Sequence, residues 1–110
     1  MEAPPSHAMV QRADESQLKR ALSAKALRDR FARGGPEVLD IRPLAYVDSL
    51  GDEALRVLVI LSDDTKPAQL KWEKLGPIRQ AIHEAVRTAN DERHPYVRFM
   101  TRQEYRETRG

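Results

Sequence analysis

Paired carboxylates stand at the end of the most apolar stretch of this 110-residue chain, where residues 57–61 (VLVIL) lead through a serine to Asp63 and Asp64. Carboxylate oxygens that converge from separate elements bind Mg²⁺ or Mn²⁺ and support metal-dependent reactions. The remaining ligands would have to come from Asp40, Asp48 or Glu104, which no motif positions. We therefore predict no metal site and interpret the acid pair as the polar end of a strand, which favours a helix start near Pro67.

The other side chains that commonly carry chemistry show no catalytic arrangement. The three histidines, His7, His83 and His94, lack metal-binding spacing, and no motif pairs a serine with one of them. Cysteine is absent, which excludes disulfides, thiolate catalysis and cysteine-bound zinc. We interpret the histidines as exposed residues, expect no cofactor, and favour a non-enzymatic protein.

Composition narrows the class of protein further. The chain is 40% hydrophobic and 33% charged, which is typical of one folded domain with a modest core. Its net charge of +2 permits a nucleic-acid partner without requiring one. The start of the chain lacks the blocks of a signal peptide, and the longest apolar run has only five residues. We therefore expect a cytoplasmic protein that does not enter a membrane.

The elements that must position any site follow the order α-β-β-α(α)-β-α. Helix-forming composition predicts a helix over residues 15–33 that ends at a Gly-Gly-Pro sequence. The later elements are a hairpin of strands 37–47 and 54–61, helices 67–75 and 77–90 broken at Gly76, a strand 96–100, and a terminal helix opened by the capping-box match Thr101–Glu104.

These elements predict an α/β domain, an α+β two-layer sandwich with a three-stranded mixed sheet. Pro43 cannot donate to a ladder, so the first strand belongs at an edge. The second strand is apolar on both faces and belongs in the centre, and a helical crossover places the third strand parallel to it, in the order 1-2-3. We predict a single domain over residues 14–110 and a flexible arm over residues 1–13.

Alternation within the strands divides their side chains between two faces of the sheet. We expect the first face to pack against the amphipathic helix with Leu39, Ile41, Val47, Leu55, Val57, Val59, Leu61, Val97 and Phe99. The second face then holds Arg42, Leu44, Tyr46, Arg56, Leu58, Ile60, Tyr96, Arg98 and Met100. This second face is too apolar to stay bare and too charged for an ordinary core.

Three interpretations compete for the second face. The N-terminal helix covers it as a third layer, or it forms a homodimer interface, because tyrosine, arginine and methionine are enriched in interfaces. Alternatively it binds single-stranded nucleic acid, with Tyr46 and Tyr96 stacking on bases and the arginines contacting phosphates. A basic run in the N-terminal helix is either a phosphate-facing surface or a solvated one, and it contains Lys19, Arg20, Lys25, Arg28, Arg30 and Arg33.

A known layout resembles this order of elements. The stretches LDIRPLAYVDSLGDEALRVLVILSDD, LGPIRQAIHEAV and HPYVRFM resemble the hairpin, helix pair and last strand of the type II KH arrangement and, in spacing, of the ribosome-binding factor A family. The resemblance covers most of residues 15–101 and implies nucleic-acid binding. The Gly-x-x-Gly loop that clamps nucleic acid in KH domains is absent, and Gly76 is followed by Pro77.

Our prediction is a small non-enzymatic module that acts by protein association, with itself as a homodimer or with a protein partner. The second face supplies the contact residues, namely Arg42, Tyr46, Arg56, Leu58, Tyr96, Arg98 and Met100. The alternative is a nucleic-acid-binding module that uses this face and the basic helix. A third interpretation is a metal-dependent enzyme that uses Asp63 and Asp64.

Overall fold

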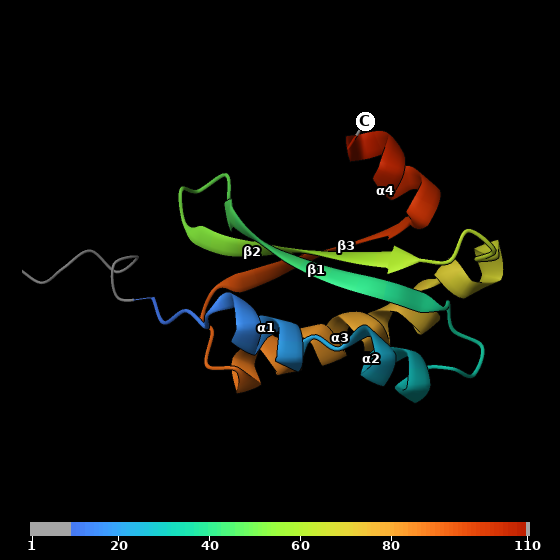
Figure 1. Ribbon diagram of the computed structural model, residues 1–110, viewed down its shortest axis with the longest axis horizontal. Helices are drawn as coiled ribbons and strands as arrows, with labels where there is room; N and C mark the ends of the chain where they lie inside the picture. Colours follow the sequence, from blue (N-terminus) through green and yellow to red (C-terminus); the bar gives the residue numbers. More distant parts are fainter. Residues whose placement is uncertain (1–9, 110) are drawn as a thin grey trace, which may run out of the picture.

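A computed structural model describes residues 10–109 and shows a three-stranded sheet with helices on both sides (Figure 1). In chain order the elements are α1 (Glu15–Ala21), α2 (Ala24–Arg30), β1 (Val38–Val47), β2 (Glu53–Leu61), the 3₁₀-helix η2 (Pro67–Leu70), α3 (Trp72–Thr88), β3 (His94–Thr101) and α4 (Arg102–Arg109). The predicted order of elements is confirmed. Most of the predicted arm, residues 1–9, lies outside the described residues.

The predicted N-terminal helix is two short helices, because the sequence contains two helix caps. The carboxylate of Asp14 accepts the N–H of Gln17 at 2.8 Å and opens α1. The hydroxyl of Ser23 accepts the N–H of Ala26 at 3.1 Å and opens α2. A capping residue has an extended backbone, so the chain must leave the helix at Ser23 before α2 can begin.

Strand order and direction confirm the predicted mixed sheet. β1 pairs antiparallel and β3 parallel with the central β2, in the order β1-β2-β3. The register of β1 shifts between Val38 and Asp40, which leaves Leu39 without a partner on β2. This bulge turns the fully buried Val38 into the core in place of Leu39, which corrects the predicted first face. Val47 is also exposed instead of buried.

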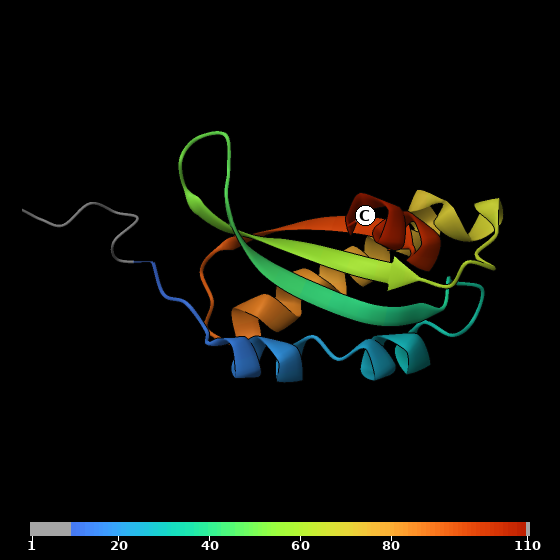
Figure 2. The same ribbon diagram turned by 45° about the horizontal axis from the view of Figure 1, so that its top comes forward.

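Helices α1, α2 and α3 all lie on the first face of the sheet, and α4 lies on the second (Figures 1 and 2). Leu18, Leu22 and Leu27 share one core with Ile78 and Ile82 of α3 and with the first face of the sheet. The interpretation that the N-terminal helix covers the second face is therefore wrong. The break at Ser23 changes the direction of α2. Leu18 and Leu27, which would point to opposite sides of one continuous helix, therefore meet in the same core.

The break between the two predicted central helices lies at Lys71 instead of Gly76. η2 ends at Leu70, and α3 then runs from Trp72 to Thr88 with Pro77 inside it. A Cβ at Gly76 would lie 3.1 Å from the indole of Trp72, so glycine permits the close approach of that ring. Because the helix is continuous here, residues 72–88 form no loop where a KH domain places its clamp.

Among residues 10–109, every helix is too short or too polar to span a bilayer.

Candidate functional site

Helix α4 divides the second face of the sheet into two halves. Leu58, Ile60 and Met100 are only 9%, 4% and 6% exposed, and they form a small core against which Tyr105 of α4 packs. The guanidinium of Arg42 lies 5.3 Å from the centre of the Tyr105 ring. Three residues predicted to form the binding face, Arg42, Leu58 and Met100, thus belong to this half, which we call the covered half.

Two caps fix the start of α4. The predicted capping box is confirmed, because Thr101 Oγ1 accepts the N–H of Glu104 at 3.2 Å and Glu104 Oε1 accepts the N–H of Thr101 at 2.8 Å. Asp63 Oδ1 accepts the N–H of Gln103 at 2.8 Å, while Asp64 is exposed. Asp63 therefore stabilises the start of α4, and not the helix start near Pro67 that the sequence predicted. Residues 10–109 contain no group of three or more histidines and acids that could hold a metal ion.

The open half of the second face contains Leu44, Tyr46, Arg56, Tyr96 and Arg98. Leu44 is 47% and Tyr96 40% exposed. The rings of Tyr46 and Tyr96 meet edge to face, with centres 5.8 Å apart. The guanidinium of Arg56 stacks over Tyr46, 4.2 Å from its centre. The structure thus brings together the tyrosines and Arg56 from three different strands, as alternation predicted.

Two histidines extend this cluster around the free edge of β3. The ring of His94 lies 4.6 Å from that of Tyr96, and the ring of His83 on α3 lies 5.4 Å from that of His94. We call the four rings of Tyr46, Tyr96, His94 and His83 the ring row. Sequence reasoning missed both histidines, although His94 and Tyr96 are two residues apart in a strand and therefore share a face.

The carboxylate of Asp48 fixes the middle of the ring row. Its Oδ1 accepts the N–H groups of Leu50 and Asp52, both at 3.0 Å, and its Oδ2 accepts the hydroxyl of Tyr96 at 3.0 Å. The hydrogen bond from Asp52, with a smaller contribution from Tyr96, lowers the pKa of Asp48. In return the carboxylate raises the pKa of Tyr96, so this ring remains a neutral phenol held to the hairpin turn.

Arginines lie near the ring row, although the charges of Asp48 and Asp52 act on Tyr96 in its middle. Arg79 and Arg87 lie one turn before and after His83 on α3, and Arg98 follows Tyr96 on β3. None of these arginines, nor Arg56, forms an ion pair within residues 10–109. Burial lowers the pKa of His83, and the charges of His94, Arg79 and Arg87 lower it further. The surface near His83 therefore favours an anionic ligand.

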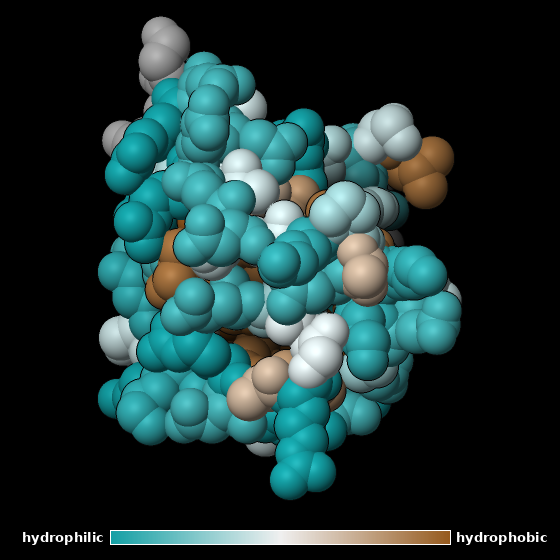
Figure 3. All heavy atoms as spheres, turned by 90° about the vertical axis from the view of Figure 1, so that its right-hand side faces the viewer, coloured by the Kyte–Doolittle hydropathy of each residue, from teal (hydrophilic) through white to brown (hydrophobic). Residues whose placement is uncertain are grey.

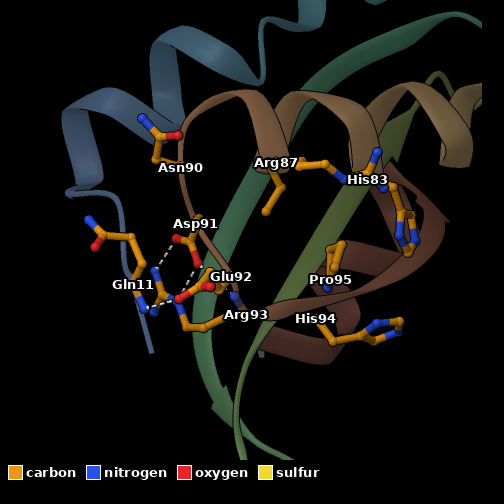
Figure 4. A pocket seen from close by; sticks show the side chains of 10 residues that line it. Gln11, His83, Arg87, Asn90, Asp91, Glu92, Arg93, His94 and Pro95 are labelled. Carbon is orange, nitrogen blue, oxygen red and sulfur yellow. Dashed lines mark hydrogen bonds and ion pairs between the residues drawn. The ribbon is translucent and has the colours of Figure 1, made fainter. Parts of the chain in front are cut away.

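A hollow of ≈ 890 Å³ adjoins the end of the ring row, between the end of α3 and the start of β3 (Figure 4). Its back wall is an ion pair of Asp91 and Arg93, 2.7 Å apart and almost completely buried. Burial raises the pKa of Asp91, but hydrogen bonds from Arg93 and from the N–H of Ala13 outweigh it and lower the pKa overall. Gln11 and Ala13 bond to residues 91–92, so contacts with the domain begin before residue 14.

The basic residues predicted on one helix are spread over α1, α2 and the segment after them, beside β1 at the other edge of the sheet (Figure 2). Lys19 pairs with Glu15 and Lys25 with Asp29 along their own helices. Arg28 donates to the carbonyl of Val38 at 2.8 Å, Arg30 lies 5.1 Å from the ring centre of Phe31, and Arg20 and Arg33 are exposed. These charges do not converge with the ring row.

Large exposed apolar side chains lie at the hairpin and at the opposite end of the sheet, where Leu70 is 43% and Trp72 66% exposed. Val47 is 64% and Leu50 84% exposed, and Leu44 lies nearby on the same strand as Val47. At the end of the molecule that carries η2, polar residues predominate and apolar ones are scattered among them (Figure 3).

No family model matches the chain, and comparison with curated proteins and with solved structures yields no match.

Proposed function

We propose that this protein binds single-stranded nucleic acid across the ring row. The observation that carries the proposal is a continuous series of four aromatic rings bordered by arginines that have no acidic partner within residues 10–109. Bases stack on aromatic side chains whatever their sequence, and arginines near the platform bind the phosphates. We therefore expect affinity without strong sequence preference.

The inclination of the rings favours a single strand over a duplex. Neighbouring rings of the row are inclined by 75°, 70° and 72°. Their faces therefore point in different directions, and a ligand that stacks on more than one ring must turn its bases out separately. Unpaired bases can do so, whereas bases in a duplex are held in one continuous stack.

The same geometry argues against a homodimer through the second face. α4 already covers Leu58, Ile60 and Met100, the apolar residues that would drive such an association. In a twofold dimer each surface meets its own copy, so Arg56 and Arg98 would approach the same charges on the other subunit. Like charges brought together at an interface oppose binding.

Protein association through the hairpin is the second candidate, supported by the exposure of Val47 and Leu50. Two large exposed aliphatic residues at one end of a small domain suit an apolar partner surface. Light scattering of the protein and of the Leu50→Asp variant tests self-association. A concentration-dependent dimer that the substitution abolishes supports this candidate, and a monomer at high micromolar concentration removes the homodimer.

Fluorescence anisotropy with labelled oligo-dT and oligo-U at low salt tests the main proposal. Because stacking contributes about 1–3 kcal/mol per base, Tyr46→Ala and Tyr96→Ala should each weaken binding roughly 5- to 150-fold. Tyr46→Phe and Tyr96→Phe keep the rings and should keep most of the affinity. Leu70→Ala removes a side chain that is 43% exposed on η2, outside the open half, and serves as the control. Absence of binding at low salt, or binding unchanged by both alanine variants, would contradict the proposal.

A further inference from the structure

The hollow beside His83 lies where the ring row ends, and two rings of the row, His83 and His94, also line it. Besides Arg93, which is paired with Asp91, three basic side chains border it: His83 and Arg87 from α3, one helical turn apart, and His94 from the start of β3 (Figure 4). The two imidazoles are in contact, with centres 5.4 Å apart. A strand that follows the row past His94 therefore reaches this hollow next.

We propose that the hollow is a phosphate-binding subsite in which His83, Arg87 and His94 hold a phosphate group of the bound strand. The inference rests on the proposed function for the source of the phosphate. The three basic groups are available to a phosphate from any source, because neither Arg87 nor the two histidines form an ion pair within residues 10–109.

The acids near the hollow are already engaged by other groups. Asp91 is buried against Arg93 and also accepts the N–H of Ala13. Glu92 accepts the N–H of Gln11 at 2.8 Å. Asp48, the acid whose charge reaches His94, bonds to its own turn and to Tyr96. The charge of Asp91 is balanced by Arg93, whereas Glu92 and Asp48 are held by neutral donors and keep their charge. The lining of the hollow is therefore positive overall when His83 and His94 are protonated.

Arg79 adds to this charge from a distance. Its guanidinium stacks 5.5 Å from the ring centre of Trp72, and it does not line the hollow. Its charge nevertheless lowers the pKa of His83, together with burial and the charges of His94 and Arg87. A bound phosphate would offset these positive charges and favour the imidazolium form. Phosphate binding should therefore raise the pKa of His83 and strengthen as the pH falls through that pKa.

The first test uses inorganic phosphate as the probe, at an ionic strength held constant with chloride. The ring-proton NMR signals of His83 and His94 are followed from pH 5 to pH 8 with and without phosphate. We expect phosphate to raise the pKa of His83, and the Arg87→Gln variant to reduce the shift. Arg102→Gln removes an exposed arginine on α4 and should leave the shift unchanged. Histidine titrations that phosphate does not alter would overturn the subsite.

The second test identifies the source of the phosphate with oligo-dT that carries a 5′-phosphate, a 3′-phosphate or neither. A terminal phosphate in the hollow should tighten binding by roughly up to fivefold for each exposed charge contact, and Arg87→Gln should remove the gain. Equal affinities for the three oligonucleotides, each reduced by Arg87→Gln, assign the subsite to an internal phosphodiester. Affinities that Arg87→Gln leaves unchanged would overturn the link between the hollow and the strand.

The two proposals fail in different ways. If oligonucleotides bind and the tyrosine variants weaken them, but phosphate leaves both histidine titrations unchanged, the proposed function stands and the subsite is refuted. If phosphate raises the pKa of His83 but no oligonucleotide binds at low salt, the subsite stands as a site for free phosphate and the proposed function is refuted.

Discussion

The covered and open halves of the second face come from the same three strands but differ in what lies over them. Leu58, Ile60 and Met100 form a small core beneath α4, whereas Tyr96 is exposed and Tyr46 half-buried beyond it. Alternation in β2 assigns Arg56, Leu58 and Ile60 to one face without distinguishing them. The position of one short helix, and not the pattern of the strands, therefore separates the core from the candidate binding surface.

The lengths of the elements explain why the cover is partial. α4 has 8 residues and spans roughly 12 Å, whereas the 9 residues of β2 span roughly 30 Å. α4 also begins directly after β3, so it can lie only over the end of the sheet at which β3 finishes (Figure 1). The hairpin end of the second face, where Tyr46 and Tyr96 lie, is beyond its reach.

The largest effect should be a loss of stability when an aliphatic side chain of the covered half is truncated. The same change in the open half should have almost no effect. Ile60→Ala leaves a cavity beneath α4 and should lower the free energy of unfolding by about 2–5 kcal/mol. Leu44→Ala changes a half-exposed residue on the same face and should stay within about 0.5 kcal/mol. Urea denaturation of both variants measures the difference, and equal losses would show that the two halves are not distinct.

A smaller effect should follow when α4 loses a cap. Asp63→Ala removes the acceptor of the Gln103 N–H and should cost about 1 kcal/mol of stability, with no change in oligonucleotide affinity. Asp64→Ala is the matched control, because the Asp64 side chain makes no hydrogen bond within residues 10–109. A large loss of affinity on Asp63→Ala would mean that α4 contributes to binding and that the division between the halves is misplaced.

The smallest effect concerns charge in the open half. If Arg98 contacts a phosphate, Arg98→Gln should reduce the slope of log affinity against log salt concentration by about 1 and weaken binding to all sequences alike. Lys25→Gln is the control, since Lys25 is paired with Asp29 on α2 in the layer over the other face. An unchanged salt slope for Arg98→Gln would show that the bound nucleic acid does not contact Arg98.

Local signals in the sequence were sufficient to predict the order of elements. Residues 48–53 form a turn with Gly51 at a φ of +83°, and the Thr101–Glu104 capping box forms as its spacing indicates. The open cluster of Tyr46, Arg56 and Tyr96 followed from alternation together with the predicted strand order. Each of these features depends on residues that are close in sequence or on a single crossover rule.

The remaining features depend on contacts between distant residues. His83 joins the ring row only because α3 crosses the sheet where β3 begins, and no periodicity reveals that approach. The choice of face by α4 depends on its packing through Tyr105 and on the bond from Gln103 to Asp63, 40 residues earlier. The bulge at Leu39 has no local signature either, so Val38 could not be recognised as the core residue.

Asp48 has a consequence for where this chain tolerates added residues. Hairpin turns are usually the first choice for inserting a tag or a peptide, because exposed loop tips accept extra length. Here one carboxylate joins the turn to the hydroxyl of Tyr96, so an insertion between residues 48 and 52 would release that ring as well as the loop. The exposed connection around Asp64 is no safer for a tag, because the neighbouring Asp63 accepts the N–H of Gln103 and stabilises the start of α4.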